Sequence, residues 1–253
     1  MNKDWKSIAI EAAQQAGEKI LEIYKTDFEV YTKADDSPVT TADLASNSII
    51  NFFLSKTGIP ILSEEEDFGS YGKRKNLKYL WIVDPLDGTK EFLNKFDDFA
   101  VNIALISENK PVFGLIYKPV TKQLIFAEKG KGAFLLENNK ETKLPLPSKR
   151  ANYIFLKSRS HPDAQLEEYL ENLKTTTPNL EIKIVGSSIK FFEIALGNAD
   201  EYTRFNPTME WDTASGQIIV NEVGKSLIDN NTKKEMLYNR ENLKNNGFRV
   251  ADF

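Results

Sequence analysis

Cysteine is missing from this chain of 253 residues, and histidine occurs only once, at His161. The absence of thiols excludes disulfides, thiolate zinc sites and cysteine nucleophiles. A single imidazole excludes metal centres built from several histidines. Any metal must therefore be held by oxygen atoms, which suits hard cations such as Mg²⁺. A chain without cysteine also fits a reducing compartment, so we expect a cytoplasmic protein.

Long apolar runs and an excess of basic residues are also missing. The longest apolar stretches, such as residues 100–106, have the length of a strand, so we expect no membrane-spanning segment. Residues 3–11 mix charges with apolar positions and do not predict a secretory signal. The 33 Lys and Arg against 37 Asp and Glu give a formal charge of −4. Because nucleic-acid binding needs many contacts between basic side chains and phosphates, we do not expect this acidic protein to bind nucleic acid.

The first half of the chain predicts two helices followed by strands. Apolar residues at helical spacing indicate a helix over residues 4–24 and another after residue 43. We expect the second helix to bury Leu44, Ile49, Ile50, Phe53 and Leu54. Apolar runs bounded by turn residues predict strands at residues 59–62, 79–83, 99–107, 111–117, 123–128 and 132–136. The last four of these strands are expected to form an antiparallel meander.

The second half alternates strands and helices, a pattern typical of α/β layering. The polar residues 137–151 are interpreted as the crossing between an N-terminal α+β lobe, residues 1–145, and a C-terminal α/β lobe, residues 146–253. Residues 230–246 are interpreted as a solvated tail region. The alternating strands and helices are predicted at residues 153–157, 162–173, 182–185, 189–196, 201–203 and 213–223.

Acidic residues follow predicted strands at three places. They are residues 64–66 after the strand at 59–62, Asp84 with Asp87 after the strand at 79–83, and Asp212. Layered α/β folds place ligands at strand ends. Carboxylates that converge there repel one another unless a cation neutralises them. The pattern favours a divalent metal site, with enough ligands for two ions, although each motif alone is an ordinary turn or solvated loop.

Residues 84–89 (DPLDGT) combine several chemical groups within one turn. Pro85 fixes φ and cannot continue a strand ladder, so the turn can present both carboxylates and a backbone carbonyl to one point. Gly88 permits a close backbone approach, and Gly88 with Thr89 can begin a helical turn whose N–H groups bind phosphate. The segment therefore supplies metal ligands, phosphate donors and a hydroxyl that can orient water.

Four motifs resemble the inositol monophosphatase superfamily. They are residues 39–43 (VTTAD), 62–65 (LSEE), 81–89 (WIVDPLDGT) and 211–216 (WDTASG), and the likeness extends from the first helix to residue 250. The resemblance implies a layered αβαβα sandwich of the sugar-phosphatase type. Residues 90–92 (KEF), 158–161 (SRSH), 186–191 (GSSIKF) and 207–212 (PTMEWD) further resemble the bacterial 3'(2'),5'-bisphosphate nucleotidases. Ser215 departs from the family's usual alanine.

That resemblance implies a reaction and an assignment of residues. Such enzymes hydrolyse the 3'-phosphate of 3'-phosphoadenosine 5'-phosphate, or of its sulfated form, with two or three Mg²⁺ ions, and lithium inhibits them. The implied metal ligands are Glu64, Asp84, the Leu86 carbonyl, Asp87 and Asp212. The implied catalytic residues are Asp43, Thr89 and Glu65. The implied substrate-binding residues are Glu64, Leu86, Asp87, Gly88, Thr89, Ser158, His161, Gly186, Ser187, Lys190, Arg204 and Asp212.

Several alternatives stay open from the residues themselves. Arg159 and Lys190 can bind a second phosphate, but Arg159 can equally form a structural ion pair and Lys190 can lie on a helix surface. His161 can instead cap a helix.

Two other functions also stay open. An inositol or sugar monophosphatase would share the chemistry, whereas a non-catalytic nucleotide-binding protein would not be an enzyme. We expect a monomer or a homodimer, and the resemblance also allows a peripheral location at the cytoplasmic face of the membrane.

Overall fold

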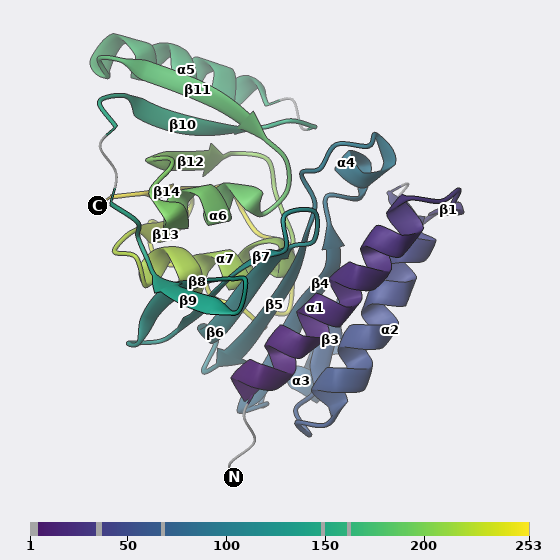
Figure 1. Cartoon of the computed structure of the whole chain (residues 1–253). Coiled ribbons are helices and arrows are strands. Elements are labelled where there is room, and N and C mark those ends of the chain that lie inside the picture. The colour runs from purple at the N-terminus through teal and green to yellow at the C-terminus, as the bar shows by residue number, and fades with distance from the viewer. Residues whose placement is uncertain (1–4, 34–36, 67–68, 148–149, 161–162, 253) are drawn as a thin grey trace.

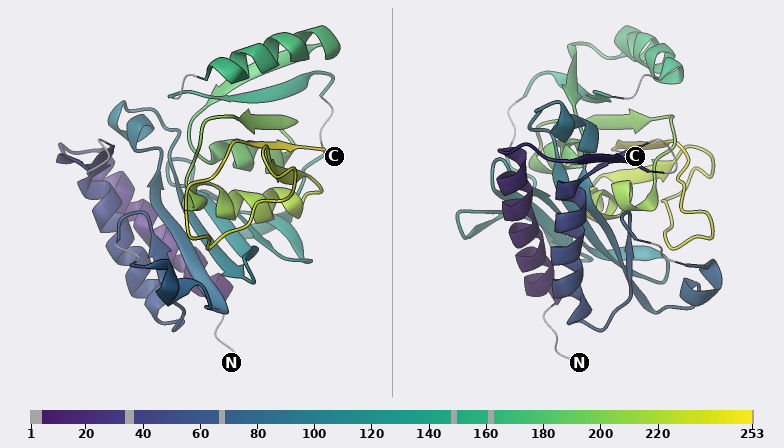
Figure 2. Two further views of the ribbon diagram at one scale, coloured as in Figure 1. Left: turned by 180° about the vertical axis from the view of Figure 1, so that it is seen from behind. Right: turned by 90° about the vertical axis from the view of Figure 1, so that its right-hand side faces the viewer.

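The chain folds into five alternating layers of helix and sheet (Figure 1). The computed structural model describes residues 5–33, 37–66, 69–147, 150–160 and 163–252. Helices α1 (Trp5–Tyr24) and α2 (Thr41–Ser55) form one outer layer and lie side by side (Figure 2). A seven-stranded sheet, a middle helical layer, a five-stranded sheet and one outer helix follow. This order confirms the predicted αβαβα sandwich.

The seven-stranded sheet carries the central part of the molecule. Only its edge pair, β3 and β4, is parallel, and every other neighbouring pair is antiparallel. Along β4, Trp81 and Val83 face the α1–α2 layer while Leu80 and Ile82 face the middle layer. In sheet order the strands are β3 (Ile61–Ser63), β4 (Tyr79–Asp87), β5 (Ala100–Ser107), β6 (Lys110–Lys118), β7 (Gln123–Glu128), β8 (Gly132–Glu137) and β9 (Lys140–Lys143).

Helices α6 (Ile189–Leu196) and α7 (Glu210–Asn221) form the middle layer between the two sheets. Gly114 of β6 lets α7 approach the sheet, because a Cβ there would lie 2.9 Å from the Ser215 Cα. Short pieces flank the first sheet: the hairpin of β1 (Val30–Thr32) and β2 (Pro38–Thr40), and helices α3 (Tyr71–Arg74) and α4 (Thr89–Leu93).

The five-stranded sheet is mixed, and it is covered on its outer face by α5 (Ala164–Thr176). Phe155 of the sheet packs there against Leu166 and Leu170 of the helix. The parallel part places the ends of β10 and β11 toward α4 (Figure 1). In sheet order the strands are β11 (Leu180–Val185), β10 (Tyr153–Ser158), β12 (Glu201–Arg204), β14 (Phe248–Ala251) and β13 (Ser226–Asp229).

Two expectations about burial were wrong. Leu44 is 43% exposed on the outer side of α2, because the buried face of that helix is formed by Ala42, Ser46, Ile50 and Leu54. Residues 230–246 are not a solvated tail. Their Met236, Tyr238 and Leu243 side chains are buried against the core, and these apolar residues are spaced too irregularly to predict an element. The division into lobes at residues 145 and 146 stays a prediction.

No helix in the described part of the chain has the length and apolar character needed to cross a membrane.

Candidate active site

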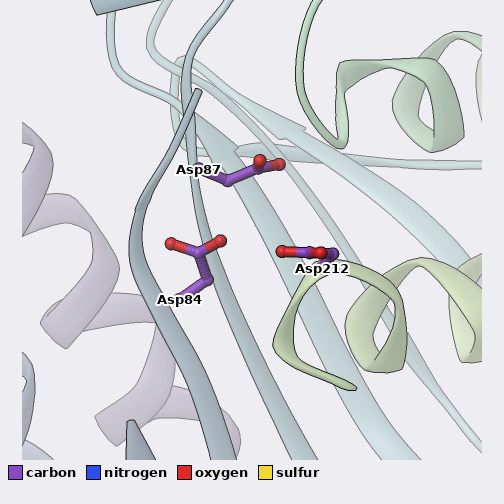
Figure 3. A group of neighbouring side chains, drawn as sticks. All are labelled: Asp84, Asp87 and Asp212. Atoms are coloured by element: carbon purple, nitrogen blue, oxygen red, sulfur yellow. The ribbon is translucent and has the colours of Figure 1, made fainter. Parts of the chain in front are cut away.

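Three aspartates point toward one another between β4 and α7 (Figure 3). Carboxylate oxygens of Asp84, Asp87 and Asp212 all lie within 4.8 Å of one another. Asp84 and Asp87 come from the end of β4, and Asp212 lies in the first turn of α7. Segments more than a hundred residues apart in the sequence therefore meet in one acidic cluster. The predicted strand end holds for Asp84 and Asp87, whereas Asp212 was wrongly expected after a strand and begins a helix instead.

An irregularity at the end of β4 brings the first two aspartates to the same point. The pairing of β4 with β5 shifts register between Asp84 and Asp87. The Leu86 N–H donates to Asp84 Oδ1 at 3.1 Å, and the Ser46 hydroxyl of α2 donates to the Pro85 carbonyl at 2.6 Å. These bonds fix the turn around Pro85 and so bring the two carboxylates toward the same point.

Asp87 is also held by hydrogen bonds from the start of α6 and from β5. The Ser188 N–H, at the start of α6, donates to Asp87 Oδ2, and the Asn102 amide donates to the same oxygen at 3.3 Å. The Ser188 hydroxyl in turn donates to Asn102 Oδ1 at 2.7 Å. The middle helical layer therefore positions one of the acidic ligands.

Glu64 and Glu65 follow β3 and share one cation. The Lys33 ammonium donates to Glu64 Oε1 at 2.8 Å and to Glu65 Oε1 at 2.7 Å. Glu64 lines the same pocket as the three aspartates, whereas Glu65 does not. Glu64 therefore lies in the pocket with the three aspartates. Glu65 does not line the pocket and is linked to Glu64 through Lys33.

The electrostatics of the cluster fit a divalent cation. Burial, and then the charges of Glu64, Asp87 and Asp212, raise the pKa of Asp84 well above its usual range. Burial and the Asp87 and Glu64 charges raise the pKa of Asp212 to about 7. Burial also raises the pKa of Glu64 despite the opposing effect of Lys33. The negative charges of these acids repel one another, so that ionising all of them at once is unfavourable. A hard cation bound by their oxygen atoms would relieve this repulsion.

Asp43 and Thr89 form a hydrogen-bonded pair beside the acidic cluster. The Thr89 hydroxyl donates to Asp43 Oδ1 at 3.0 Å and also lies 3.3 Å from the Leu86 carbonyl. The other carboxylate oxygen of Asp43 accepts from the Thr40 N–H at 2.7 Å, as part of the capping box that begins α2. Burial raises the pKa of Asp43, although the Thr40 and Thr89 bonds oppose it. The pair can orient a water and accept its proton.

One pocket joins the acidic cluster to the residues predicted to bind the nucleotide. His161 lies outside the described residues. The members of the pocket that had been predicted for metal or substrate are Glu64, Asp84, Leu86, Asp87, Gly88, Thr89, Ser158, Gly186, Ser187, Lys190, Arg204 and Asp212.

The basic residues of this pocket have different surroundings. Lys190 is 2% exposed, so it is not a surface residue, and its ammonium donates to the carbonyls of Val185 and Ser187. Arg159 both lines the pocket and forms an ion pair with Asp98 at 2.7 Å. Arg204 lies near Asp212, and its buried Nε has no hydrogen-bond partner among the described residues. Arg159 and Arg204 therefore offer positive charge to an anionic group in this pocket, with Arg204 beside the acidic cluster.

Sequence reasoning missed the residues that support this site. Lys33, Ser46 and Asn102 each bind a predicted functional residue or its turn, yet each is distant from it in the sequence. Thr40 could have been found, because a Thr followed three residues later by an acidic side chain is the pattern of a capping box.

Comparisons with known proteins agree with this geometry. A model described as "Inositol monophosphatase family" matches residues 1–250. The curated protein "3'(2'),5'-bisphosphate nucleotidase CysQ" from Escherichia coli is 39% identical over 246 residues, which cover 94% of this chain and 96% of that protein.

Comparison with solved structures also points to the inositol monophosphatase family. A crystal structure of CysQ from Bacteroides thetaiotaomicron, a bacterial member of the inositol monophosphatase family, superposes with a TM-score of 0.88 at 41% identity, covering 97% of this chain and 96% of that one. The extragenic suppressor protein suhB from Bartonella henselae is 26% identical with a TM-score of 0.78, covering 98% and 93% of the two chains.

Proposed function

This chain belongs to the inositol monophosphatase family, and on that premise we propose that it is a Mg²⁺-dependent 3'(2'),5'-bisphosphate nucleotidase. Its reaction is hydrolysis of the 3'-phosphate of 3'-phosphoadenosine 5'-phosphate, or of the sulfated form, to release inorganic phosphate. The observation that carries this proposal is the single pocket that joins the acidic cluster to the cationic residues Arg159 and Arg204. The 39% identity to a protein named for this activity supports it.

In this proposal, the metal is held by oxygen ligands at the acidic end of the pocket. The residues that would hold it are Glu64, Asp84, Leu86 through its carbonyl, Asp87 and Asp212, all of which line the pocket. When bound, Mg²⁺ supplies positive charge that offsets these carboxylates and the charge on the transferring phosphoryl group. We keep the expectation of two or three ions.

The residues beside the acidic cluster carry out the proton transfer. Asp43 and the Thr89 hydroxyl hold a water in line with the scissile P–O bond, and Asp43 accepts its proton. The water oxygen forms the new bond to phosphorus while the bond to the 3'-oxygen breaks, and that oxygen leaves with a proton from solvent. Glu65 supports this end of the pocket through Lys33. Gly88 and Thr89 offer backbone N–H groups to the phosphate.

The other end of the pocket recognises the rest of the nucleotide. Ser158, Gly186 and Ser187 line it, and Arg159 contributes positive charge there, while Arg204 contributes positive charge nearer to Asp212. Lys190 holds the turn between β11 and α6 through its two carbonyl contacts. We retain His161 as a further nucleotide contact. The proposal also keeps the cytoplasmic location expected from the sequence, and the monomer or homodimer.

A phosphate-release assay tests this function. Wild-type protein is supplied with 3'-phosphoadenosine 5'-phosphate, its sulfated form, inositol 1-phosphate or a sugar phosphate, each with and without Mg²⁺. We expect Mg²⁺-dependent release that is fastest with the bisphosphate nucleotides. Faster turnover of inositol 1-phosphate would instead support the monophosphatase, which membership of the inositol monophosphatase family keeps as the second candidate.

A variant separates catalysis from simple nucleotide binding. Asp87→Asn removes a charge from the acidic cluster while keeping an acceptor for the Ser188 and Asn102 N–H groups. We expect this variant to keep its fold and lose hydrolysis. Full activity in Asp87→Asn would show that Asp87 is not an essential ligand, and no release by the wild type from any phosphate ester would leave a non-catalytic binding protein.

A further inference from the structure

Two acidic residues that follow the turn of residues 84–89 form their contacts with residues outside the acidic cluster. Glu91 lies in α4, and Asp98 lies in the loop between α4 and β5. Glu91 is 5% exposed, and its Oε1 accepts the Ser160 hydroxyl at 2.6 Å. Neither acid has a part in the proposed chemistry. A buried carboxylate beside a pocket for an anionic substrate needs a separate explanation, since its charge opposes binding.

Asp98 contacts two different segments through the same oxygen. Its Oδ2 accepts from Arg159 Nη2 at 2.7 Å and from the Gly186 N–H at 3.0 Å. The Arg159 guanidinium also lies 4.7 Å from the centre of the Phe96 ring, so its position is fixed on two sides. Arg159 is thereby held beside the pocket, and among the residues that the structure describes its hydrogen bond to Asp98 uses only Nη2 of the guanidinium donors.

Gly186 shows how tightly these pieces fit. A Cβ at this position would lie 2.7 Å from Glu91 Cγ and 2.8 Å from Asp98 Cβ. The turn before α6 therefore rests directly on both acids. Through Glu91 and Asp98, the short segment after the metal-binding turn contacts both stretches that line the far end of the pocket, residues 158–160 and 186–188.

The contribution of these contacts to stability is small. The Arg159 and Asp98 side chains are 35% and 26% exposed, and ion pairs with such exposure add little to the free energy of unfolding. Their geometric effect is larger, because a guanidinium fixed by one carboxylate can bind a phosphate with its remaining donors at a lower entropic cost. The pair is therefore better explained by orientation than by stability.

We infer that Glu91 and Asp98 are positioning residues, which orient Ser160 and Arg159 to bind the second phosphate of the substrate. This inference rests on the proposed nucleotidase function. It also gives a role to Glu91, the middle residue of the stretch 90–92 (KEF) that resembles the nucleotidases. The acids act through their partners and do not themselves touch the reacting atoms.

Steady-state kinetics on a matched pair of substrates test the role of Asp98. Adenosine 3'-monophosphate carries the scissile phosphate of 3'-phosphoadenosine 5'-phosphate but lacks the second one. Asp98→Asn keeps an acceptor for the Gly186 N–H and removes the charge that holds Arg159. We expect its KM for the bisphosphate to rise about tenfold, the scale of one lost charge-assisted hydrogen bond, while kcat and the KM for the monophosphate change less than about twofold.

Asp97→Asn is the matched control for this change. Asp97 is the neighbouring residue, is exposed, and accepts a hydrogen bond from the Tyr24 hydroxyl, away from the pocket. We expect its KM values to equal those of the wild type. An equal rise in KM with Asp97→Asn would mean that long-range charge, not the contact with Arg159, produces the effect, and would overturn the inference.

Glu91 is tested by rescue. Glu91→Ala removes the acceptor of Ser160, whereas Glu91→Gln keeps a carbonyl oxygen at the same place. We expect Glu91→Ala to raise the KM for the bisphosphate selectively and Glu91→Gln to restore most of the loss. If Glu91→Gln is as impaired as Glu91→Ala while circular dichroism shows both folded, the Ser160 contact is not what matters and the role of Glu91 is wrong.

A double variant tests whether Asp98 acts through Arg159. If it does, Asp98→Asn combined with Arg159→Gln should bind the bisphosphate no more weakly than Arg159→Gln alone. Additive losses would contradict the inference. Its failure is distinct from failure of the proposed function: a wild-type enzyme that does not prefer the bisphosphate to adenosine 3'-monophosphate would disprove the substrate, whereas preference that survives in every variant would disprove only the positioning role.

Discussion

At the scale of single residues, Asp43 joins helix capping to the proposed chemistry. Its Oδ1 accepts the Thr89 hydroxyl, and its other oxygen accepts from Thr40. Asp43→Asn leaves a neutral group that cannot accept a proton from water, so we expect kcat to fall by about 10³-fold. The free energy of unfolding should stay the same or rise slightly, because burial raises the pKa of Asp43 and asparagine keeps an oxygen that can accept the capping bond from Thr40.

Phosphate release and urea unfolding measure these two effects for Asp43→Asn. Asp27→Asn, the same change at an exposed position, is the control and should alter neither quantity. A kcat within a few-fold of the wild type would show that Asp43 is not the proton acceptor.

Ser215 carries a buried hydroxyl that costs stability. The residue is 1% exposed, and its Oγ finds no hydrogen-bond partner in the part of the chain that the structure describes. Replacing it by alanine removes an unsatisfied polar atom with little change of shape, so we expect Ser215→Ala to raise the free energy of unfolding by about 1 kcal/mol. Urea denaturation measures this gain, and a loss of stability would mean that the hydroxyl is bonded in the folded protein.

Sequence could locate the acidic residues but not their partners. Asp84 and Asp87 lie at the end of a strongly patterned strand, where ligands are expected, whereas Asp212 lies at the start of a helix. The contacts between Arg159 and Asp98, 61 positions apart, do not follow from any local pattern. A sequence shows that a side chain is charged, whereas only the packing of layers decides which charge it faces.

At the scale of elements, the packing of α7 on β6 controls where Asp212 lies. A Cβ on Gly114 would lie 2.6 Å from Ile218 Cγ2 and 3.0 Å from the Ser215 carbonyl oxygen, so α7 would have to move. We expect Gly114→Ala to lower the free energy of unfolding by about 1–3 kcal/mol, as overpacking does, and to weaken metal binding because Asp212 moves with the helix.

Thermal unfolding and Mg²⁺ titration check the effect of Gly114→Ala. Gly72→Ala serves as the control, since the nearest atom to a Cβ there is the Ser70 Oγ at 3.9 Å. It should leave stability unchanged or slightly raised. Equal stability of the two variants would show that α7 can yield at little cost.

Elements with a clear period were predicted well, and short polar ones were missed. Helix α6 has the predicted bounds, because its apolar residues repeat at helical spacing. Helix α7 begins at Glu210, earlier than the predicted residue 213, because its first turn contains Glu210 and Asp212, and Asp212 was expected at the end of a strand. Strand β9 (Lys140–Lys143) has no apolar residue, so only its pairing with β8 defines it.

At the scale of the whole molecule, the acidic cluster makes stability depend on pH and on the metal. Burial and neighbouring charges raise the pKa of Asp84 and Asp212, the latter to about 7, whereas these acids ionise near pH 4 in the unfolded chain. A raised carboxyl pKa costs nothing below the unfolded value. The cost develops as pH rises toward the folded value, so metal-free protein should lose stability over this window.

Thermal unfolding with Mg²⁺ or with a chelator, between pH 5 and pH 8, tests this dependence. Because the metal replaces protons at these carboxylates, we expect the Mg²⁺-induced rise in Tm to be small at pH 5 and to grow toward pH 8. A rise in Tm that is the same at both ends of this range would contradict the proton–metal competition.

The order of layers could be predicted only with the help of the family resemblance. Alternating strands and helices indicated layering, but not that α6 and α7 lie between two sheets and help to bury both. That arrangement depends on contacts between residues far apart in the sequence, such as Ser188 with Asp87.

The bond from the Ser188 N–H to Asp87 has a thermodynamic consequence. The turn that lines the nucleotide end of the pocket also holds a carboxylate of the metal end, so whatever orders one partner favours the other. Metal and nucleotide should then bind cooperatively. Linkage makes this cooperativity reciprocal: the factor by which Mg²⁺ tightens nucleotide binding equals the factor by which the nucleotide tightens Mg²⁺ binding.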